Sequence, residues 1–189
     1  MKLVFATNNS NKLSEIRSLV PDGIEILSLK EINCNEELPE TNPTLKENAL
    51  QKARYVFDNY GFNCFADDTG LEIDALGGEP GVYSARYAGE DCSAEDNMNK
   101  VLQKLEGEEN RKANFRTVIA LIIDGKETLF EGECKGEITQ TKSGVEGFGY
   151  DPIFIPNGYQ LTFAEMNKVE KGAISHRGKA VKRLVSSLY

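Results

Sequence analysis

Apolar runs alternate with helical periodicity through the first part of the chain. Residues 3–6 form an uninterrupted apolar run, which predicts a buried strand. A polar turn over 7–12 follows, and apolar residues then recur at helical spacing over 13–20. A second strand is predicted over 24–27, and a helix is predicted to begin at Thr44, directly after a proline. This alternation of strands and helices indicates an α/β fold.

The middle of the sequence combines strand patterns with an acidic segment. An apolar run over 62–66 and an alternating run over 71–76 flank Asp67-Asp68-Thr69-Gly70. This pattern predicts a strand, an acidic turn and a second strand. A capping signal over 93–96 then precedes a helix whose apolar residues extend to Leu105.

The later part of the sequence predicts antiparallel strands. Residues 115–123 and 127–130 flank Asp124-Gly125, a two-residue hairpin signal. A third antiparallel strand is predicted over 133–139, and a last helix is marked by apolar residues over 181–188. A β-meander joined to the α/β part predicts one mixed sheet.

Composition indicates a single domain spanning residues 1–189. The chain is 40% hydrophobic and 28% charged, and no apolar run approaches the length needed to cross a bilayer. Its first apolar run is too short for a secretory signal, so a cytoplasmic location without membrane association is expected. Four widely spaced cysteines without a C-x-x-C pair argue against a zinc cluster and favour reduced thiols. A net charge of −8 disfavours nucleic acid as a partner, whereas an anionic small molecule would need a local cationic cluster or a metal.

Two segments near strand ends offer phosphate and metal chemistry. The polar turn over 7–12 opens a helix, so it either attracts phosphate with its N–H groups and Lys12 or serves only as a capping loop. Asp67-Asp68 offers oxygen ligands suited to Mg²⁺, although Asp, Thr and Gly also form ordinary turns. Lys52 lies about 20° beyond Leu45 on a helical wheel. It either exposes its ammonium group to water or reaches an anion near Glu40 and Asp68.

Two later segments carry further candidate chemistry. Residues 144–152 form a glycine-rich loop with two aromatic residues, and such a loop either binds a flat base or folds as a flexible hairpin with Phe148 in the core. Residues 171–179 contain the only histidine of the chain, His176, beside Arg177. A basic cluster at a helix start opposes the helix dipole, which suggests a functional role, with a surface patch near a C-terminal helix as the alternative.

Together, these motifs resemble those of the inosine triphosphate pyrophosphatase family, whose members are also called dITP/XTP diphosphatases. The matching segments are Thr7, Asn9 and Lys12 in a T-x-N-x-x-K opening, Pro39-Glu40-Thr41, Glu47-Asn48-Ala49, residues 66–71, residues 80–87, residues 147–152 and Ser175-His176-Arg177-Gly178. They cover essentially the whole chain in the family's order. The resemblance is therefore much more specific than any one motif.

The resemblance implies a fold, a reaction and a partner. The expected fold is a long mixed sheet flanked by helices, with two lobes and a substrate cleft between them. The expected reaction is Mg²⁺-dependent hydrolysis of ITP, dITP and XTP to the nucleoside monophosphate and pyrophosphate. The family's members are commonly homodimers, so a homodimer is expected as well.

The resemblance also implies the residues of the site. Glu40 and Asp68 are expected to hold Mg²⁺, with Asp68 as the proton acceptor for the attacking water. The other expected substrate contacts are Thr7, Asn8, Asn9, Ser10, Asn11, Lys12, Lys52, Thr69, Phe148, Gly149, Tyr150, Asp151, Lys171, His176 and Arg177. Of these, the residues expected to position the phosphates are Thr7, Asn9, Lys12, Lys52 and Thr69. Lys171 is expected to join them or the base pocket. Phe148 is expected to stack on the purine, and His176 and Arg177 to meet its keto edge.

Three residues depart from the family pattern, and two other functions compete. Asn8 and Asn42 stand where the family commonly has Gly, and Thr69 replaces a common Ser. Asn8 is a tolerable exchange if its backbone is left-handed.

A phosphohydrolase that forms an aspartyl-phosphate would need a carboxylate after the first strand, where the chain has Thr7-Asn8-Asn9. A non-catalytic nucleotide sensor would have no reason to keep the two metal-binding carboxylates.

Overall fold

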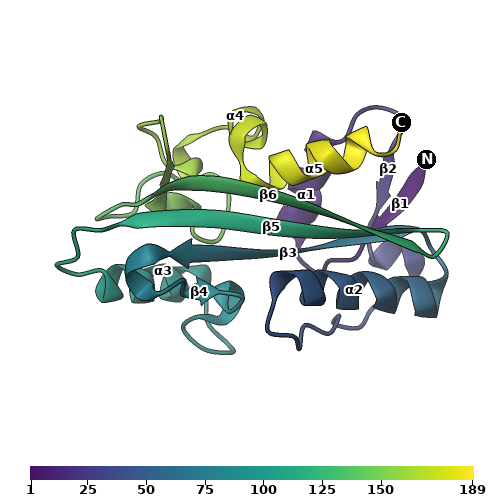
Figure 1. The fold of residues 1–189 in the computed structure, drawn as a ribbon, viewed down its shortest axis with the longest axis horizontal. Helices are drawn as coiled ribbons and strands as arrows, with labels where there is room; N and C mark the ends of the chain where they lie inside the picture. Colours follow the sequence, from purple (N-terminus) through teal and green to yellow (C-terminus); the bar gives the residue numbers. More distant parts are fainter. The chain divides into compact units, whose positions relative to one another are not determined.

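The computed structural model describes all residues from 1 to 189, which form one mixed seven-stranded sheet with five α-helices (Figure 1). The strands are β1 (Lys2–Phe5), β2 (Glu25–Leu27), β3 (Cys64–Ile73), β4 (Pro80–Gly81), β5 (Lys112–Ile123), β6 (Lys126–Ile138) and β7 (Phe154–Pro156). The helices are α1 (Ser10–Leu19), α2 (Leu45–Tyr60), α3 (Ala94–Lys104), α4 (Lys168–Ile174) and α5 (His176–Ser186). The strand order is β2-β1-β3-β5-β6-β7, and β4 pairs with β3. The predicted mixed sheet flanked by helices is confirmed.

The chain divides into two compact units. Unit 1 contains residues 1–68, 117–132 and 177–189, and unit 2 contains residues 69–116 and 133–176. The expectation of a single domain stays a prediction.

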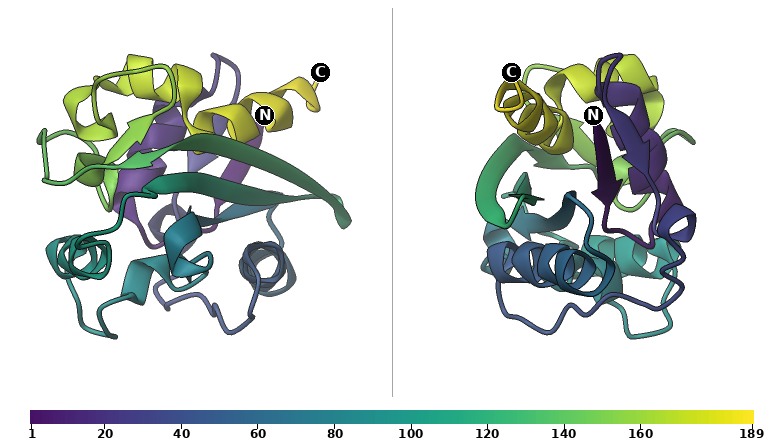
Figure 2. Two further views of the ribbon diagram at one scale, coloured as in Figure 1. Left: turned by 60° about the vertical axis from the view of Figure 1, so that its left-hand side comes forward. Right: turned by 90° about the vertical axis from the view of Figure 1, so that its right-hand side faces the viewer.

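The sheet of unit 1 is covered on both faces. Because neighbouring side chains of a strand point to opposite faces, β1 sends Leu3 and Phe5 to one side and Val4 to the other. Leu3 and Phe5 pack with apolar residues of α1 and α5. Val4 packs with apolar residues of α2. Figures 1 and 2 show α1 and α5 on one side of these strands and α2 on the other.

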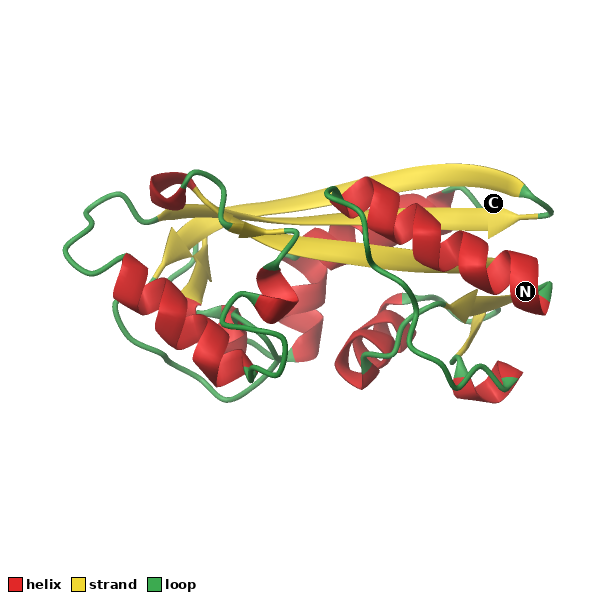
Figure 3. Ribbon diagram, turned by 90° about the horizontal axis from the view of Figure 1, so that it is seen from below, coloured by secondary structure: helices red, strands yellow, loops and turns green.

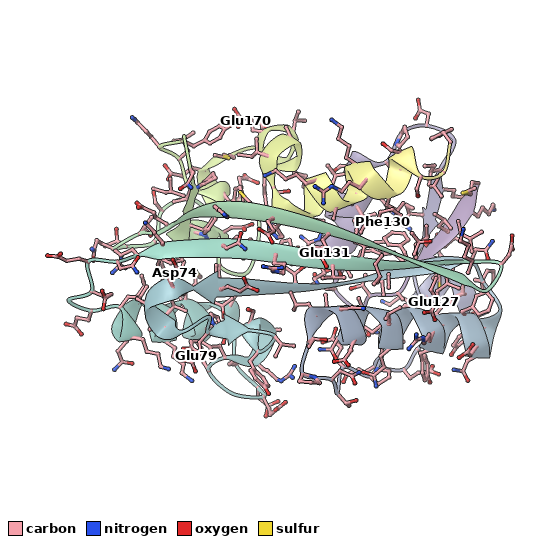
Figure 4. The ribbon with its side chains drawn as sticks, viewed as in Figure 1. Asp74, Glu79, Glu127, Phe130, Glu131 and Glu170 are labelled. Carbon is pink, nitrogen blue, oxygen red and sulfur yellow. The ribbon has the colours of Figure 1, made fainter.

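Helix α2 begins where the sequence predicts. The side chain of Thr44 caps it by accepting the N–H of Glu47, and Gly61 ends it in a left-handed conformation with φ 70°. Arg54 donates to both carboxylate oxygens of Glu127 on β6, at 2.6 and 2.8 Å. Figure 3 shows α2 lying along the strands, and Figure 4 labels Glu127 near the β5–β6 hairpin.

The acidic segment 67–70 is not a turn, so this part of the prediction is wrong. It lies within β3, a ten-residue strand whose Asp67 and Asp68 are both buried. Turn-forming residue types normally interrupt a strand. Here the strand continues because β5 pairs with β3, because β1 and β4 pair with the residues of β3 before and after this segment, and because cationic side chains neutralise Asp67.

The predicted antiparallel strands need a second correction. The hairpin at Asp124-Gly125 is confirmed, with φ 50° and 80° at its two residues. Residues 133–139 do not form a separate strand, since β6 continues for thirteen residues to Ile138. The strand that pairs with the end of β6 in antiparallel fashion is β7.

Unit 2 has its own core, built from strands and α3. Apolar residues of α3, including Met98 and Val101, pack with Leu71 of β3, Phe115 of β5 and Phe154 of β7. A capping box formed by Ser93 and Asp96 confirms the predicted start of α3.

The C-terminal part of the chain is more helical than predicted. The short helix α4 was not predicted, and α5 begins at His176, before the predicted apolar positions. None of the five helices combines the length and the apolar character that crossing a membrane requires.

Candidate functional site

The polar turn after β1 is shaped by two of its own side chains. The side chain of Asn9 caps α1 by accepting the N–H groups of Asn11 and Lys12, at 3.0 and 3.1 Å. The hydroxyl of Thr7 accepts the N–H of Asn9 at 3.1 Å. Both readings of this turn are therefore compatible with the structure, since a capping loop also directs N–H groups toward an anion. Ser10 and Asn11 are exposed in the first turn of α1.

Asn8 fits this turn for a reason that the sequence did not predict. Its backbone is not left-handed, so that explanation of the departure from Gly is wrong. Instead, its amide group donates to the carbonyl of Glu36 and accepts the N–H of Leu38, each at 3.3 Å. The side chain thereby ties the turn to the segment that leads to Glu40.

A buried ion network lies beside the turn, in unit 1. Asp67 is fully buried and accepts from Lys12 Nζ and from Arg177 Nε, each at 3.0 Å. Arg177 also donates to Glu15 at 2.6 Å. Burial alone would raise the pKa of Asp67, but the charges of Lys12 and Arg177 outweigh it and hold the pKa well below its ordinary value. Burial lowers the pKa of Lys12, and Asp67 opposes that change.

The adjacent carboxylate, Asp68, has the opposite electrostatic character. Burial raises its pKa to about 6, and the nearby charge of Glu40 adds to that rise. Lys52, which is buried, donates to Glu40 and to the Asp67 carbonyl, the latter at 2.6 Å. Lys52 therefore reaches an anion, as one of its two predicted alternatives proposed. A carboxylate with a raised pKa near neutrality is suited to accept a proton.

Among the predicted site residues, Glu40 and Asp68 are the carboxylates of unit 1 that could hold a divalent cation. Their oxygen atoms suit Mg²⁺, which takes one or two protein carboxylates and completes its octahedron with water and substrate phosphates. Burial is the main cause of the raised pKa of Asp68, and the nearby negative charge of Glu40 adds to it, so a cation bound by both carboxylates would offset the two charges. The chain has no cluster of three or more metal-binding side chains.

A second set of predicted residues lies in unit 2, around the glycine-rich loop. The buried carboxylate of Asp151 accepts from Lys171 Nζ at 2.6 Å and from the N–H of Phe148 at 3.0 Å. The same Nζ lies 4.9 Å from the centre of the Phe148 ring. These contacts fix the loop and hold Phe148, which is only half-buried, as an aromatic surface.

Gly147→Ala is expected to destabilise this loop more than Gly149→Ala. Both glycines have positive φ, 71° and 61°, so both substitutions strain the backbone. Only at Gly147 would the new Cβ collide with the carboxylate of Asp151. We expect Gly147→Ala to cost about 2 kcal/mol more free energy of unfolding. Urea denaturation of the two variants measures this difference, and equal losses would contradict it.

Three more predicted residues of unit 2 are buried or partly buried. The ring of His176 stacks on Phe115, with centroids 4.6 Å apart and planes at 15°. Tyr150 donates to the Ser84 carbonyl at 2.6 Å, and burial raises its pKa. Thr69 lies in β3, half-buried. The predicted residues thus fall into two sets, one in each unit.

Sequence reasoning missed three residues of unit 1. It gave Asp67 no separate role, although that carboxylate joins Lys12 to Arg177. It also gave no role to Glu15 or to Asn48, which donates to Asp68 at 3.1 Å. Only Asn48 had a usable signal, because it lies four residues before Lys52 on the predicted helix and so shares its face.

The fold and the site define an α/β protein with a buried site of carboxylates and lysines and a separate aromatic loop. Comparison with known proteins identifies the family of this chain. The family model described as the Ham1 family matches residues 3–187, so the chain belongs to the Ham1 family. This confirms the resemblance carried by its motifs.

Individual relatives agree with this assignment. The chain is 59% identical over 188 residues to a protein of Flavobacterium johnsoniae named dITP/XTP pyrophosphatase, covering 100% of this chain and 98% of that protein. It is 57% identical to a protein of the same name from Christiangramia forsetii, with coverage of 100% and 99%. The solved structure of the Ham1 protein from Staphylococcus aureus matches with a TM-score of 0.88 and 40% identity, covering 100% of this chain and 98% of that one. A HAM1 protein from Coxiella burnetii matches with a TM-score of 0.90, 40% identity and the same coverage.

Proposed function

We propose that this protein is a Mg²⁺-dependent nucleoside triphosphate pyrophosphatase. Its substrates are the non-standard purine nucleotides ITP, dITP and XTP, and its products are the nucleoside monophosphate and pyrophosphate. Family membership and the names of close relatives support the reaction class. The observation that carries the proposal is the buried carboxylate of Asp68, with a pKa of about 6, beside Glu40 and Lys52.

Asp68 acts as the general base in this proposal. Above pH 6 it is mostly ionised, so it accepts a proton from a water molecule. The water oxygen forms a bond to the α-phosphorus as the bond from that phosphorus to the α,β-bridging oxygen breaks. The electron pair of the broken bond leaves with pyrophosphate. The reaction needs no covalent enzyme intermediate, in agreement with the lack of a carboxylate after β1.

Cations of the protein offset the charge of the triphosphate. Glu40 and Asp68 would hold Mg²⁺, which supplies Lewis-acid stabilisation of phosphate oxygens. Lys12 and Lys52 carry positive charge at the same end of unit 1, and the capped turn of α1 adds N–H groups. The bound cation would offset the carboxylates and the triphosphate, and together with these lysines it would allow a chain with a net charge of −8 to bind a polyanion.

Product analysis tests the proposed reaction. With Mg²⁺ present, ITP is expected to yield IMP and pyrophosphate in equal amounts, and chelation with EDTA is expected to stop the reaction. Ion-exchange chromatography of the nucleotides and a pyrophosphate assay measure both products. Formation of IDP with orthophosphate would contradict attack at the α-phosphorus, and binding of ITP without turnover would favour a nucleotide sensor.

We further propose that His176 and Arg177 recognise the base by its keto edge. Hypoxanthine and xanthine have an acceptor oxygen at C6, where adenine has an amino donor. The guanidinium of Arg177 has only donors, so it pairs with the first two bases and mismatches adenine. The cytoplasmic location stays a prediction from the sequence pattern, and the homodimer stays a prediction from the family resemblance.

Arg177→Lys is expected to lower the ratio of kcat/KM for ITP to that for ATP by about 10-fold or more. Lysine keeps a positive charge for Asp67 and Glu15 but loses the planar set of donors. Steady-state kinetics with both nucleotides measure the ratio. Arg183→Lys is the matched control, since Arg183 lies on the same helix and donates to the Glu131 carbonyl of β6, away from Asp67 and Glu15. An equal loss for ITP and ATP would show that Arg177 serves the ion network instead.

A further inference from the structure

Helix α2 turns two polar side chains, Asn48 and Lys52, toward the protein interior. They are 1% and 4% exposed, on a face that otherwise carries small and apolar residues. Lys52 donates to Glu40 and to the Asp67 carbonyl. Asn48 takes no part in the chemistry described above. A fully buried amide is costly unless its hydrogen bonds are made, so its contacts indicate what it does.

The side chain of Asn48 joins two segments that are far apart in the sequence. Its Nδ2 donates to Oδ2 of Asp68 at 3.1 Å and to the carbonyl of Asn42 at 3.2 Å. Its Oδ1 accepts the N–H of Asn42 at 2.8 Å. Asn42 lies two residues after Glu40, so one amide group bridges the two carboxylate-bearing segments.

These contacts hold the amide of Asn48 in one orientation. Nδ2 carries two N–H donors, and both have an acceptor here. In the flipped orientation, Oδ1 would face the carboxylate of Asp68, and the amide nitrogen would face the N–H of Asn42. Both contacts would then be repulsive, so the orientation follows from the network.

We propose that Asn48 is a positioning residue that holds Asp68 and the Glu40 segment in the arrangement in which both carboxylates bind the catalytic cation. This inference rests on the proposed function of the same site. Residues that hydrogen-bond metal ligands orient them, and their loss typically weakens metal binding or activity by about 10- to 100-fold. Lys52, one helical turn further along α2, holds the carboxylate of Glu40, so a single helix face fixes both ligands.

Gln51 provides a comparison within the same helix. Its side chain accepts the N–H of Thr41 at 3.0 Å and donates to the Thr41 hydroxyl at 2.9 Å. It therefore anchors the segment after Glu40, as Asn48 does, but it does not reach Asp68. Lys52 joins Glu40 to the backbone of β3 at Asp67, whereas Asn48 joins the segment after Glu40 to the carboxylate of Asp68.

Direct measurement of Mn²⁺ binding tests the proposal without relying on turnover. Mn²⁺ is titrated into nucleotide-free protein and followed by electron paramagnetic resonance. We expect Asn48→Ala to raise the Mn²⁺ dissociation constant about 10-fold or more. We also expect it to lower kcat for ITP at saturating Mg²⁺ by a similar factor, with a smaller change in KM. Gln51→Ala should have a clearly smaller effect on Mn²⁺ binding, and Asn59→Ala, on the exposed end of α2, should have none.

Several outcomes would overturn the inference. One is a folded Asn48→Ala protein whose Mn²⁺ affinity and kcat lie within twofold of the wild type. Another is an equal effect of Asn48→Ala and Gln51→Ala, which would make Asn48 one more loop anchor. If Asn48→Ala does not fold, Asn48→Ser is used, because its shorter polar side chain cannot join both partners. A Mn²⁺ affinity and a kcat within twofold of the wild type would overturn the inference for this variant as well.

A double-mutant cycle separates positioning from general structural support. Since Asn48 is proposed to act through Asp68, Asn48→Ala should change Mn²⁺ affinity much less in the Asp68→Asn background than in the wild type. Additive effects would overturn the inference. The products that the wild-type protein forms from ITP test the proposed reaction, whereas Mn²⁺ binding tests the role of Asn48. A failure of one can therefore be told from a failure of the other.

Discussion

Asp68→Asn is expected to lower kcat for ITP hydrolysis by about 10²- to 10⁴-fold while the protein stays folded. The amide has nearly the same shape as the carboxylate, but it neither accepts a proton from water nor supplies a negative charge to a cation. Steady-state kinetics at saturating Mg²⁺ measure the loss. The matched control is Asp74→Asn, an exposed carboxylate just after the end of β3, labelled in Figure 4. Its activity should equal that of the wild type.

The same substitution has a predicted effect on stability, and the sign follows from the pKa. The pKa of Asp68 in the folded protein, about 6, is higher than its value in an unfolded chain. The ionised carboxylate therefore destabilises the fold above pH 6, and this cost disappears as the pH falls toward about 4. Metal-free Asp68→Asn should thus melt at the same temperature as the wild type or higher at pH 8, with a smaller difference at pH 4. A loss of activity that accompanies unfolding at pH 8 would contradict the role of Asp68 as a base.

Asp67→Asn is expected to lower the free energy of unfolding by about 3–5 kcal/mol at pH 7. Asp67 is fully buried between Lys12 and Arg177, so its replacement leaves two cations facing a neutral amide. Urea denaturation at pH 7 measures the change. The control is Asp58→Asn, an exposed carboxylate of α2, which should alter stability by less than about 0.5 kcal/mol.

The pH dependence gives a second test of the role of Asp67. Its folded-state pKa lies below the unfolded-state value, so the stability that it contributes is complete above about pH 4 and is lost as the pH falls further. The difference in stability between the wild type and Asp67→Asn should therefore shrink below pH 4. A variant within 1 kcal/mol of the wild type at pH 7 would show that the ion network adds little to the fold.

Local patterns in the sequence were sufficient for much of the fold. The apolar run of β1, the cap of α2 at Thr44 and the hairpin at Asp124-Gly125 are each decided by neighbouring residues. Such signals depend on side-chain period and backbone preference, which act over a few residues. The site residues, in contrast, came from the resemblance of whole motifs to a family. Residue type alone left an alternative for each segment. The polar turn over 7–12 could be only a capping loop, Asp67-Asp68 an ordinary turn, and residues 171–179 a surface patch.

The sequence by itself determined many of the segments that form strands and helices, and its motifs indicated the family. Only the tertiary structure decided that Asp67 and Asp68 lie within a continuous strand and differ in electrostatic character. Asp67 meets Arg177, 110 residues away, and Arg177 meets Glu15, 162 residues away. The physical reason is that burial and the field of distant charges set the pKa of a carboxylate, and neither is encoded in its neighbours along the chain.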